Sequence, residues 1–472
     1  MSFPYSKFTA GDLESLRRIC PPERVIPAGE IPEDYGHDEL SGVFRRPDVL
    51  VKVRSAEETA AIMKYASSRN IPVTPRGQGT GLVGGSVSVC GGIMVDLCLM
   101  NRFLELDREN MTLTLEPGVL LMEIGKYVEE QGLFYPPDPG EKTATIGGNI
   151  STNAGGMRAV KYGVTRDYVR GLQVVTPQGD ILEIGGKIAK NSSGYSLRDL
   201  FVGSEGTLGI VTRVTLRLLP LPKVKTSLLV PFPDLAAAIR AVPAVIQSSA
   251  IPTAVEFMER EVILAAEKFL ARKFPDNSSD AYLLLTFDGQ SKGELESACD
   301  DAAEICLKAG ALDVFISNTE ARNESIWSAR GAFLEALKAS SSGMDECDVV
   351  VPRKEIADFV LFSRELRKKY GIRICSFGHA GDGNLHIYIL RDALEEGEWK
   401  TKLQQVFDEL YGKARSLGGL VSGEHGIGLA KKSFLKKSLS PEVWRLMQGI
   451  KQVFDPENIL NPSKITGDDF LS

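Results

Sequence analysis

Residues 76–85 read Arg-Gly-Gln-Gly-Thr-Gly-Leu-Val-Gly-Gly and follow directly on a short apolar strand expected at 71–73. That strand completes a strand–helix–strand unit, because 49–53 is a second apolar run and the residues between carry an apolar helix face. Glycine costs backbone entropy, so a cluster of it needs a reason, either a positive φ or the close approach of the backbone to a ligand. The stretch therefore indicates a loop that turns tightly or faces a ligand.

Two further glycine-rich loops, at 138–156 and 185–209, follow in the same part of the chain, and glycine makes up 46 of the 472 residues. Three such loops in one domain suggest a long ligand that is contacted from several of them. The dinucleotide fingerprint G-x-G-x-x-G is absent, and so is the phosphate loop that ends in Gly-Lys-Ser/Thr. Two explanations of the glycine-rich loops remain. Either backbone N–H groups in the turns bind a diphosphate, which needs no lysine, or the loops are ordinary tight turns.

The composition is that of a globular protein without a general affinity for nucleic acid. Hydrophobic residues make up 43% and charged residues 25%, and 55 Lys and Arg face 62 Asp and Glu, a net charge of −7. Counterion release on nucleic acid needs clustered positive charge, which this balance does not supply. No stretch reaches the roughly 18 apolar residues of a membrane span, and charges stand where a signal peptide needs an apolar run. We therefore expect a soluble, cytoplasmic protein.

The seven cysteines are scattered and include no C-x-x-C pair. This spacing argues against a disulfide framework, a cysteine zinc site and an iron–sulfur cluster. It favours structural, mostly buried thiols.

The composition changes near residues 218–223, where glycine becomes rarer and longer segments begin. Strands are expected at 227–231, 254–258, 282–287, 313–317, 348–351, 373–377 and 385–390. Helices are expected at 235–241, 261–273, 293–309, 399–417 and 441–454. This pattern predicts a second domain of α+β type, in which helices cover an open sheet.

Three of the four histidines lie between positions 379 and 425, within two glycine-rich loops. His379 and His386 bracket Ala-Gly-Asp-Gly-Asn-Leu, and Glu424 and His425 follow 38 residues later. Two imidazoles and a carboxylate suit a borderline divalent metal, zinc, iron or manganese, and leave positions open for a substrate. The alternative is that these histidines are solvated or structural.

Five segments resemble the FAD-binding domain of the vanillyl-alcohol oxidase / p-cresol methylhydroxylase (PCMH) superfamily. They are Pro75-Arg-Gly-Gln-Gly-Thr-Gly-Leu82, Pro136-Pro-Asp-Pro-Gly140, Ile146-Gly-Gly-Asn-Ile-Ser-Thr-Asn-Ala-Gly-Gly156, Lys161-Tyr-Gly163 and Gly203-Ser-Glu-Gly-Thr-Leu-Gly209. The whole chain is similar to the FAD-linked D-2-hydroxyacid dehydrogenases of that superfamily, which include glycolate oxidase FAD subunits, D-lactate dehydrogenases and D-2-hydroxyglutarate dehydrogenases. Its closest likeness is to the FAD subunit of electron-bifurcating lactate dehydrogenase, through residues 190–196, 327–333 and 346–352.

The resemblance implies an α+β fold with a two-subdomain FAD-binding domain of PCMH type at 1–220. A substrate or cap domain with an antiparallel sheet is then expected at 221–415, and a C-terminal segment at 416–472 packs on the FAD domain. No histidine lies between Asp38 and Gly378, so we expect non-covalent FAD, with links through His37, Cys90 or Cys98 as the alternatives. The matching positions imply FAD contacts at Arg76, Gly77, Gln78, Gly79, Thr80, Gly81, Pro139, Thr145, Gly148, Asn149, Ser151, Thr152, Asn153, Gly155, Gly163, Glu205, Gly209, Ile210 and Asn461.

The resemblance also assigns roles in the histidine cluster. The family's metal ligands fall on His379, His386 and Glu424, and its general base falls on His425. A base with a pKa near neutrality accepts the proton of a substrate hydroxyl while hydride leaves for the flavin.

Two further residues are candidates for contact with the substrate. Arg330 matches the family's substrate-carboxylate arginine, with a surface helix arginine as the alternative. Asn384 is a candidate for a hydrogen bond to substrate, with a loop-capping role as the alternative.

Residues 345–348, Asp-Glu-Cys-Asp, replace the lysine that D-2-hydroxyglutarate dehydrogenases carry near this position. We therefore expect a small monocarboxylate such as D-lactate or glycolate, because no second cation awaits a distal carboxylate. The reaction expected is oxidation of a small 2-hydroxy acid to the 2-keto acid.

The chain carries no second redox centre, so electrons must leave to oxygen, a quinone or a protein. The resemblance implies a two-subunit electron-transferring flavoprotein that couples NAD reduction to ferredoxin, that is, electron bifurcation. A glycolate oxidase with an iron–sulfur subunit and a D-2-hydroxyglutarate dehydrogenase are the alternatives, and a non-catalytic flavin relay is a third. A serine hydrolase is not supported, because G-x-S-x-G is absent.

Overall fold

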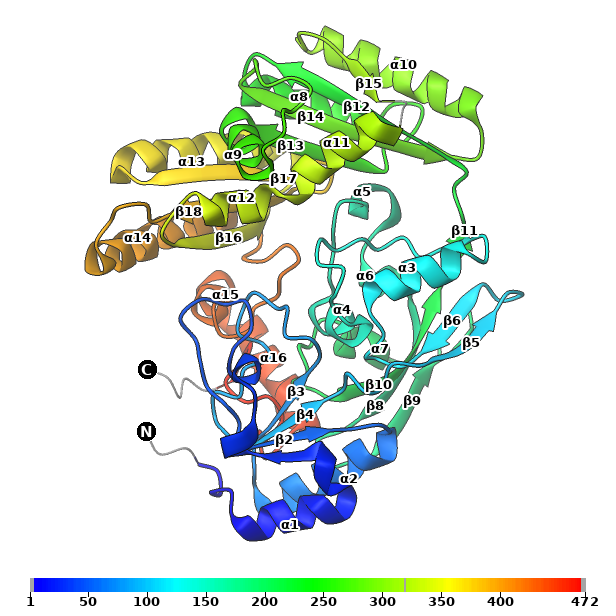
Figure 1. The fold of residues 1–472 in the computed structure, drawn as a ribbon, viewed down its shortest axis with the longest axis vertical. Coiled ribbons are helices and arrows are strands. Elements are labelled where there is room, and N and C mark those ends of the chain that lie inside the picture. Colours follow the sequence, from blue (N-terminus) through cyan, green and yellow to red (C-terminus); the bar gives the residue numbers. More distant parts are fainter. Residues whose placement is uncertain (1–3, 318–319, 468–472) are drawn as a thin grey trace. The chain divides into compact units, whose positions relative to one another are not determined.

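The computed structural model describes residues 4–317 and 320–467 (Figure 1). The chain forms two compact units. Residues 4–154, 164–221 and 425–467 belong to the first unit, and residues 155–163 and 222–424 belong to the second. The chain therefore passes between the units at four places, one of them directly after Glu424.

The first unit contains a four-stranded sheet made of β1 (Val25–Pro27), β2 (Val49–Lys52), β4 (Ile93–Asp96) and β3 (Val73–Arg76), in that order. β2, β4 and β3 run parallel, and β1 pairs with β2 in the antiparallel sense. Helix α2 (Ala56–Arg69) connects β2 to β3, and α1 (Ala10–Ile19) precedes the sheet. Ser55 caps α2 by accepting a hydrogen bond from the Glu58 N–H. The expected strand–helix–strand unit is thus present, with apolar residues of α2 and the sheet in one buried core.

A second sheet of the first unit is antiparallel throughout. Its strands, in order, are β5 (Phe103–Asp107), β6 (Thr112–Leu115), β10 (Ile210–Arg217), β8 (Val169–Val175) and β9 (Ile181–Gly185). The connections hold a ribbon of β7 (Leu133–Phe134) with β11 (Leu219–Pro220), and the short helices α3 (Leu121–Glu129), α4 (Ile146–Thr152), α6 (Thr165–Tyr168) and α7 (Leu197–Phe201). Two sheets in one unit give the two-subdomain architecture that the resemblance implies.

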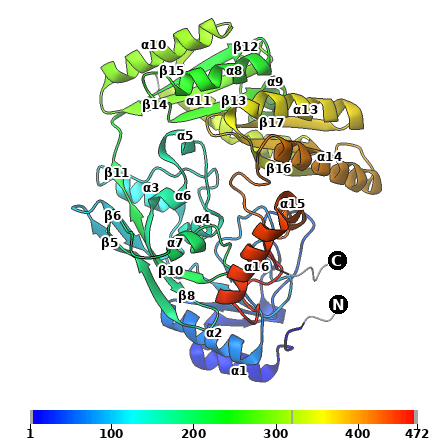
Figure 2. The ribbon, with the colours of Figure 1, turned by 180° about the vertical axis from the view of Figure 1, so that it is seen from behind.

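The C-terminal segment expected at 416–472 belongs to the first unit only from His425 on, because residues 416–424 remain with the second unit. Figure 2 shows its helices α15 (Lys432–Ser438) and α16 (Pro441–Phe454) in red. After α16 the chain lies along β3, because Val73 bonds through its N–H to Ile459 and through its carbonyl to Asn461. The Phe454 ring packs edge-on against Phe201 of α7, with ring centroids 5.3 Å apart. From His425 on, the segment is therefore an integral part of the first unit.

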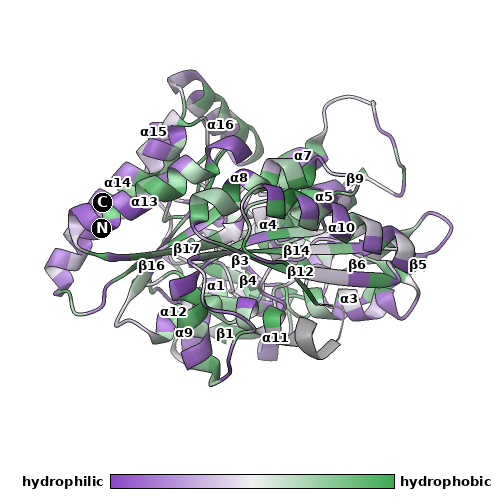
Figure 3. Cartoon of the chain, turned by 90° about the horizontal axis from the view of Figure 1, so that it is seen from above, coloured by the Kyte–Doolittle hydropathy of each residue, from purple (hydrophilic) through white to green (hydrophobic). Residues whose placement is uncertain are grey.

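The second unit is built on a seven-stranded sheet in which every pairing is antiparallel. Its strands, in order, are β15 (Phe315–Ser317), β12 (Val224–Phe232), β14 (Ala281–Gly289), β13 (Ala254–Glu259), β17 (Arg373–His379), β18 (Asn384–Leu390) and β16 (Met344–Val350). Helices α8 (Leu235–Ile246), α10 (Lys292–Lys308), α13 (Ile356–Tyr370) and α14 (Glu396–Ser416) cover one face (Figure 3). The other face packs against α9 (Arg260–Leu270), α11 (Glu320–Gly331) and α12 (Phe333–Ala339), and α5 (Ala159–Tyr162) contacts β13.

The expected strands and helices are present, with differences at their ends, and the second unit also contains helices that were not expected, among them α11, α12 and α13. The helix expected at 235–241 continues to Ile246 although Pro243 lies inside it. The strand expected from residue 71 begins at Val73, because the Ile71 N–H bonds back to Ala66 at the end of α2 and Pro72 has no N–H. Within the described residues, no helix is both long and apolar enough to cross a membrane.

Candidate active site

The three predicted metal ligands lie together at one end of the sheet in the second unit. His379 ends β17, His386 lies in β18, and Glu424 is the last residue of the unit. Glu424 Oε1 is 3.6 Å from His379 Nε2 and 3.4 Å from His386 Nε2. All three ligand atoms lie within 4.8 Å of one another, and both imidazoles are buried. The two expected loops thus meet at one point.

The glycines around His379 and His386 have a steric cause. β17 and β18 form a hairpin in which His379 pairs with Asn384, so the chain reverses within Ala380–Gly383. Gly383 has a φ of +89°, and a Cβ there would collide with the Val351 carbonyl. The Ala-Gly-Asp-Gly-Asn motif is therefore the turn that places both histidines on the same face of the sheet.

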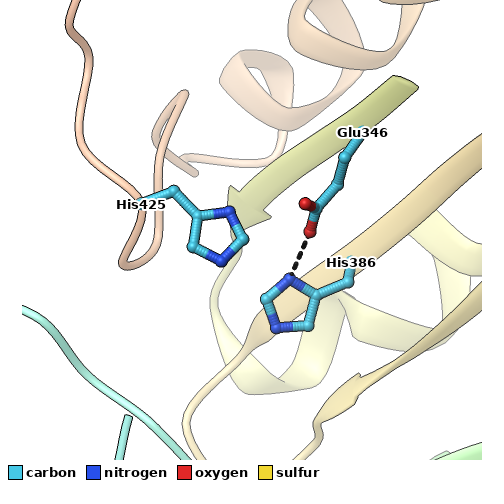
Figure 4. Close-up of side chains that lie close together, drawn as sticks. All are labelled: Glu346, His386 and His425. Carbon is cyan, nitrogen blue, oxygen red and sulfur yellow. Dashed lines mark hydrogen bonds and ion pairs between the residues drawn. The ribbon is translucent and has the colours of Figure 1, made fainter. Parts of the chain in front are cut away.

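A carboxylate binds the second ring nitrogen of each histidine. Glu256 Oε1 lies 2.6 Å from His379 Nδ1, and Glu346 Oε1 lies 2.8 Å from His386 Nδ1 (Figure 4). A carboxylate at Nδ1 holds the proton there, so Nε2 presents its lone pair to a metal. Both rings therefore direct Nε2 at the same oxygen of Glu424.

Electrostatics favours a cation among these side chains. Burial disfavours charged imidazoles, but the carboxylates beside them outweigh it and raise the pKa of His379 well above its usual value and that of His386 to about 9. Burial likewise raises the pKa of Glu256, but the charges of His379 and Arg330 lower it further, to a value below normal. A divalent metal takes the place of protons on such a donor set. Two imidazole nitrogens and a carboxylate oxygen fit zinc, iron or manganese.

Arg330, at the end of α11, reaches the cluster through Glu256. Its Nε and Nη2 donate to Glu256 Oε2 at 3.0 and 2.5 Å, while the other oxygen of that carboxylate binds His379. The guanidinium also lies 4.7 Å from the centre of the Phe377 ring. The side chain is nine-tenths buried, unlike the surface arginine that the sequence left as an alternative.

Asn384 holds the backbone around the site. Its side-chain amide donates to Asp348 Oδ1 at 2.7 Å and to the Val349 carbonyl at 2.9 Å. Both amide hydrogens are thus bound within the protein, which is the structural role that the sequence left open beside substrate binding.

His425 is the residue at which the chain re-enters the first unit, and it follows Glu424 directly. The turn after it is held within the first unit, where the Ile427 and Gly428 N–H groups donate to Glu205 at 2.7 and 2.8 Å. The peptide bond to Glu424 therefore tethers this histidine to the metal ligands.

The three glycine-rich loops of the first unit converge. The Glu205 N–H donates to the Ser151 carbonyl, and Asn461 Nδ2 donates to the carbonyls of Gly85 and Glu205. Side chains larger than hydrogen are excluded here, because a Cβ on Gly77 would collide with Thr145 and one on Gly206 with Pro75. Segments that are distant in the sequence thus come together around closely packed backbone.

Polar atoms without a partner remain in this region. Asn149 Nδ2 in α4 and Asn461 Oδ1 are buried and bind no protein group among the described residues. Such atoms fit a polar ligand along the glycine loops. Arg76 is used differently, because its guanidinium donates to the carbonyls of Asp34 and His37. All the predicted FAD contacts lie in the first unit except Gly155 and Gly163.

The chain matches two known families over most of its length. Residues 47–196 match the FAD binding domain, and residues 221–465, more than half of the chain, match FAD linked oxidases, C-terminal domain. The chain belongs to the FAD-linked oxidase family. The predictions of FAD and of an FAD-linked oxidoreductase are thereby confirmed.

Relatives of this FAD-linked oxidase span nearly its whole length. It is 49% identical to a D-lactate dehydrogenase of Anaerostipes hadrus, with 98% of each chain covered. It is 40% identical to the glycolate oxidase subunit GlcD of Bacillus subtilis, with 97% of each covered, and 33% identical to a D-2-hydroxyglutarate dehydrogenase of Stutzerimonas stutzeri, with 96% and 98% covered. A crystal structure of p-cresol methylhydroxylase superposes with a TM-score of 0.81 at 18% identity and covers 99% of each chain, which confirms the PCMH-type fold.

Sequence reasoning missed three carboxylates of this oxidase. Glu256 was not singled out, and Glu346 and Asp348 entered only as part of the stretch 345–348, which offers no cation to a distal carboxylate. The signal for Glu256 was present, because a lone carboxylate interrupts the apolar strand Ala-Val-Glu-Phe-Met and is wholly buried. A buried charge in such a run predicts a cationic partner, and here there are two.

Proposed function

We propose that this FAD-linked oxidase oxidises a small D-2-hydroxy acid, D-lactate above others, to the 2-keto acid at a divalent metal centre. The observation that carries the proposal is the convergence of His379, His386 and Glu424, with both imidazoles held at Nδ1 by carboxylates. Full-length relatives named D-lactate dehydrogenase, glycolate oxidase subunit and D-2-hydroxyglutarate dehydrogenase support this substrate class.

The residues of the chain divide the work. When bound, the metal supplies Lewis-acid polarisation of the substrate hydroxyl, and FAD supplies the hydride acceptor. His379, His386 and Glu424 hold the metal, and His425 accepts the hydroxyl proton as C2 loses its hydride. Arg330 supplies positive charge for the substrate carboxylate, and Asn384 keeps the hairpin turn in place.

In this proposal the three converging glycine loops would hold FAD. Their backbone N–H groups would bind the diphosphate, and the Asn149 amide, whose Nδ2 has no partner among the described residues, would supply a further donor. Glu205 contributes by holding the turn after His425, since both its oxygens are taken by backbone N–H groups.

Substrate choice follows from the charge around the metal ligands. Glu346 binds His386 and keeps a negative charge beside the site, so a second carboxylate on the substrate would be repelled. A panel of D-lactate, L-lactate, glycolate and D-2-hydroxyglutarate tests this, with anaerobic bleaching of the flavin as the signal. Rapid bleaching by D-lactate or glycolate and little by D-2-hydroxyglutarate is expected, and the reverse order would contradict the proposal.

The acceptor in this proposal is a two-subunit electron-transferring flavoprotein that reduces NAD with ferredoxin coupling. A likeness to the FAD subunit of bifurcating lactate dehydrogenase at 190–196, 327–333 and 346–352 supports it. NAD reduction by lactate should require both the purified flavoprotein and reduced ferredoxin. Activity without ferredoxin, or no complex on size exclusion, would exclude this partner.

A further inference from the structure

Two of the three proposed ligands are histidines that bind a carboxylate through the ring nitrogen opposite the one that faces Glu424. Glu256 in β13 pairs with His379 in β17 across the sheet, and its Oε1 binds Nδ1, the nitrogen opposite the one that faces Glu424. Glu346 in β16 likewise binds Nδ1 of His386 in β18 through its Oε1, while Nε2 of that ring faces Glu424. Each ring is therefore held by a carboxylate at Nδ1, while its Nε2 faces Glu424.

The third ligand is held through its backbone. Asp348 lies directly opposite His386 and is fully buried. Its carboxylate accepts hydrogen bonds from the Ser422 hydroxyl at 2.8 Å and from the Gly423 N–H at 3.1 Å, and a weaker one from the Glu424 N–H at 3.4 Å. Asn384 binds the other oxygen and so joins the hairpin turn to the same carboxylate.

The strand geometry explains why these carboxylates serve one site. Glu346 and Asp348 are two residues apart on β16, so their side chains project from the same face of the sheet. His386, opposite Asp348, and His379, opposite Glu256, share that face through the pairings of β17 with β18. All three carboxylates thus lie on the face of the sheet that carries the two histidines.

We propose that Glu256, Glu346 and Asp348 are positioning residues for the metal centre, one carboxylate for each ligand. The inference rests on the metal-dependent function proposed above but makes a separate claim, that residues which do not bind the metal determine how tightly it is held. A fixed ring lowers the entropy lost on metal binding, and a carboxylate at Nδ1 makes Nε2 a stronger donor.

Glu346 gives the sharpest test. Glu256 is less suitable because it also pairs with Arg330, so removing the Glu256 carboxylate would leave a buried cation without its counter-ion. Glu346→Gln keeps an oxygen that can accept from His386 Nδ1, whereas Glu346→Leu removes it. Metal-free protein is titrated with Zn²⁺ in competition with a chromophoric chelator at fixed pH. We expect the leucine variant to bind about 10–100-fold more weakly than wild type and the glutamine variant to recover most of that loss.

Glu261 on α9 offers a matched control, since its carboxylate pairs with Arg367 on the surface of the same unit. Glu261→Leu and Glu261→Gln should leave Zn²⁺ affinity unchanged. Asp348→Asn, which keeps one acceptor oxygen, should weaken binding as well and extends the test to the third ligand.

Three results would contradict the inference, and they have different meanings. If wild type binds Zn²⁺ but Glu346→Leu binds it within twofold of wild type, the positioning role is wrong and the metal centre stands. If wild type takes up none of zinc, iron(II) or manganese(II), the proposed function fails and the inference fails with it. A loss of affinity equal in the leucine and glutamine variants would also overturn the positioning role, because the conservative variant would then rescue nothing.

Discussion

Replacing Glu205 with leucine should destabilise the first unit more than an ordinary buried substitution. Glu205 is almost fully buried, and its carboxylate accepts from two backbone N–H groups, those of Ile427 and Gly428. Leucine leaves both donors buried without a partner, at a cost of about 1–3 kcal/mol each, so about 2–6 kcal/mol in all. Glutamine keeps one acceptor oxygen and should lose about half of that.

Thermal unfolding followed by flavin fluorescence measures the effect on the unit that holds the FAD loops. For a unit of this size, each kcal/mol lowers Tm by about 2–4 °C, so Glu205→Leu should unfold at least several degrees earlier than Glu205→Gln. Glu183→Leu, at an exposed position of β9, is the control and should be nearly neutral. A leucine variant that melts with wild type would refute the reasoning that this carboxylate holds the turn after His425.

His379→Ala should lose the divalent metal in elemental analysis, and a metal content equal to that of wild type would show that His379 is not a ligand. His425→Asn should keep both metal and FAD. Its flavin should be reduced by substrate about 10²–10⁴-fold more slowly than in wild type. Burial lowers the pKa of Lys464 to about 7 in the folded chain. Between pH 7 and the usual pKa of lysine, the unfolded chain therefore binds one more proton than the folded chain, and the free energy of unfolding rises with pH. In scanning calorimetry, the stability of wild type relative to Lys464→Met should therefore increase from pH 7 to pH 9. A stability difference that stays constant over this range would contradict the prediction. FAD should leave the protein on acid precipitation, because burial raises the pKa of Cys90 and Cys98 and so suppresses the thiolate that a covalent link needs; flavin retained in the pellet would show otherwise.

The secondary structure of this chain was largely readable because its apolar periodicity is strong. The helix at Pro441–Phe454 was predicted to the residue, since Ser440 and Pro441 start it and Asp455-Pro456 ends it. The predicted ends of elements were wrong where local hydrogen bonds compete with the apolar pattern. The strand that begins at Val73 is an example, because a helix cap and a proline come directly before it. No local pattern shows that residues 155–163 leave the first unit, because that depends on contacts far away in the sequence.

The candidate site was readable only in part, for a similar reason. His379, His386 and Glu424 stand out because histidine is rare here and glycine surrounds them. The carboxylates behind them reach the site through strand pairing, as when Glu256 meets His379 from 123 positions away. Such pairings follow from the order of strands in the sheet, which the spacing of residues along one chain does not encode.

The rate of flavin reduction by D-lactate in the presence and absence of metal tests the central claim most directly. The purified protein is stripped with a chelator, mixed anaerobically with D-lactate in a stopped-flow instrument, and then measured again after stoichiometric zinc, iron(II) or manganese(II) is restored. Stripped protein that keeps its FAD should reduce it at least a hundredfold more slowly, and one of the metals should restore the rate in wild type but not in His379→Ala. Equal rates before and after stripping, with metal content confirmed near zero, would contradict a metal-assisted oxidation.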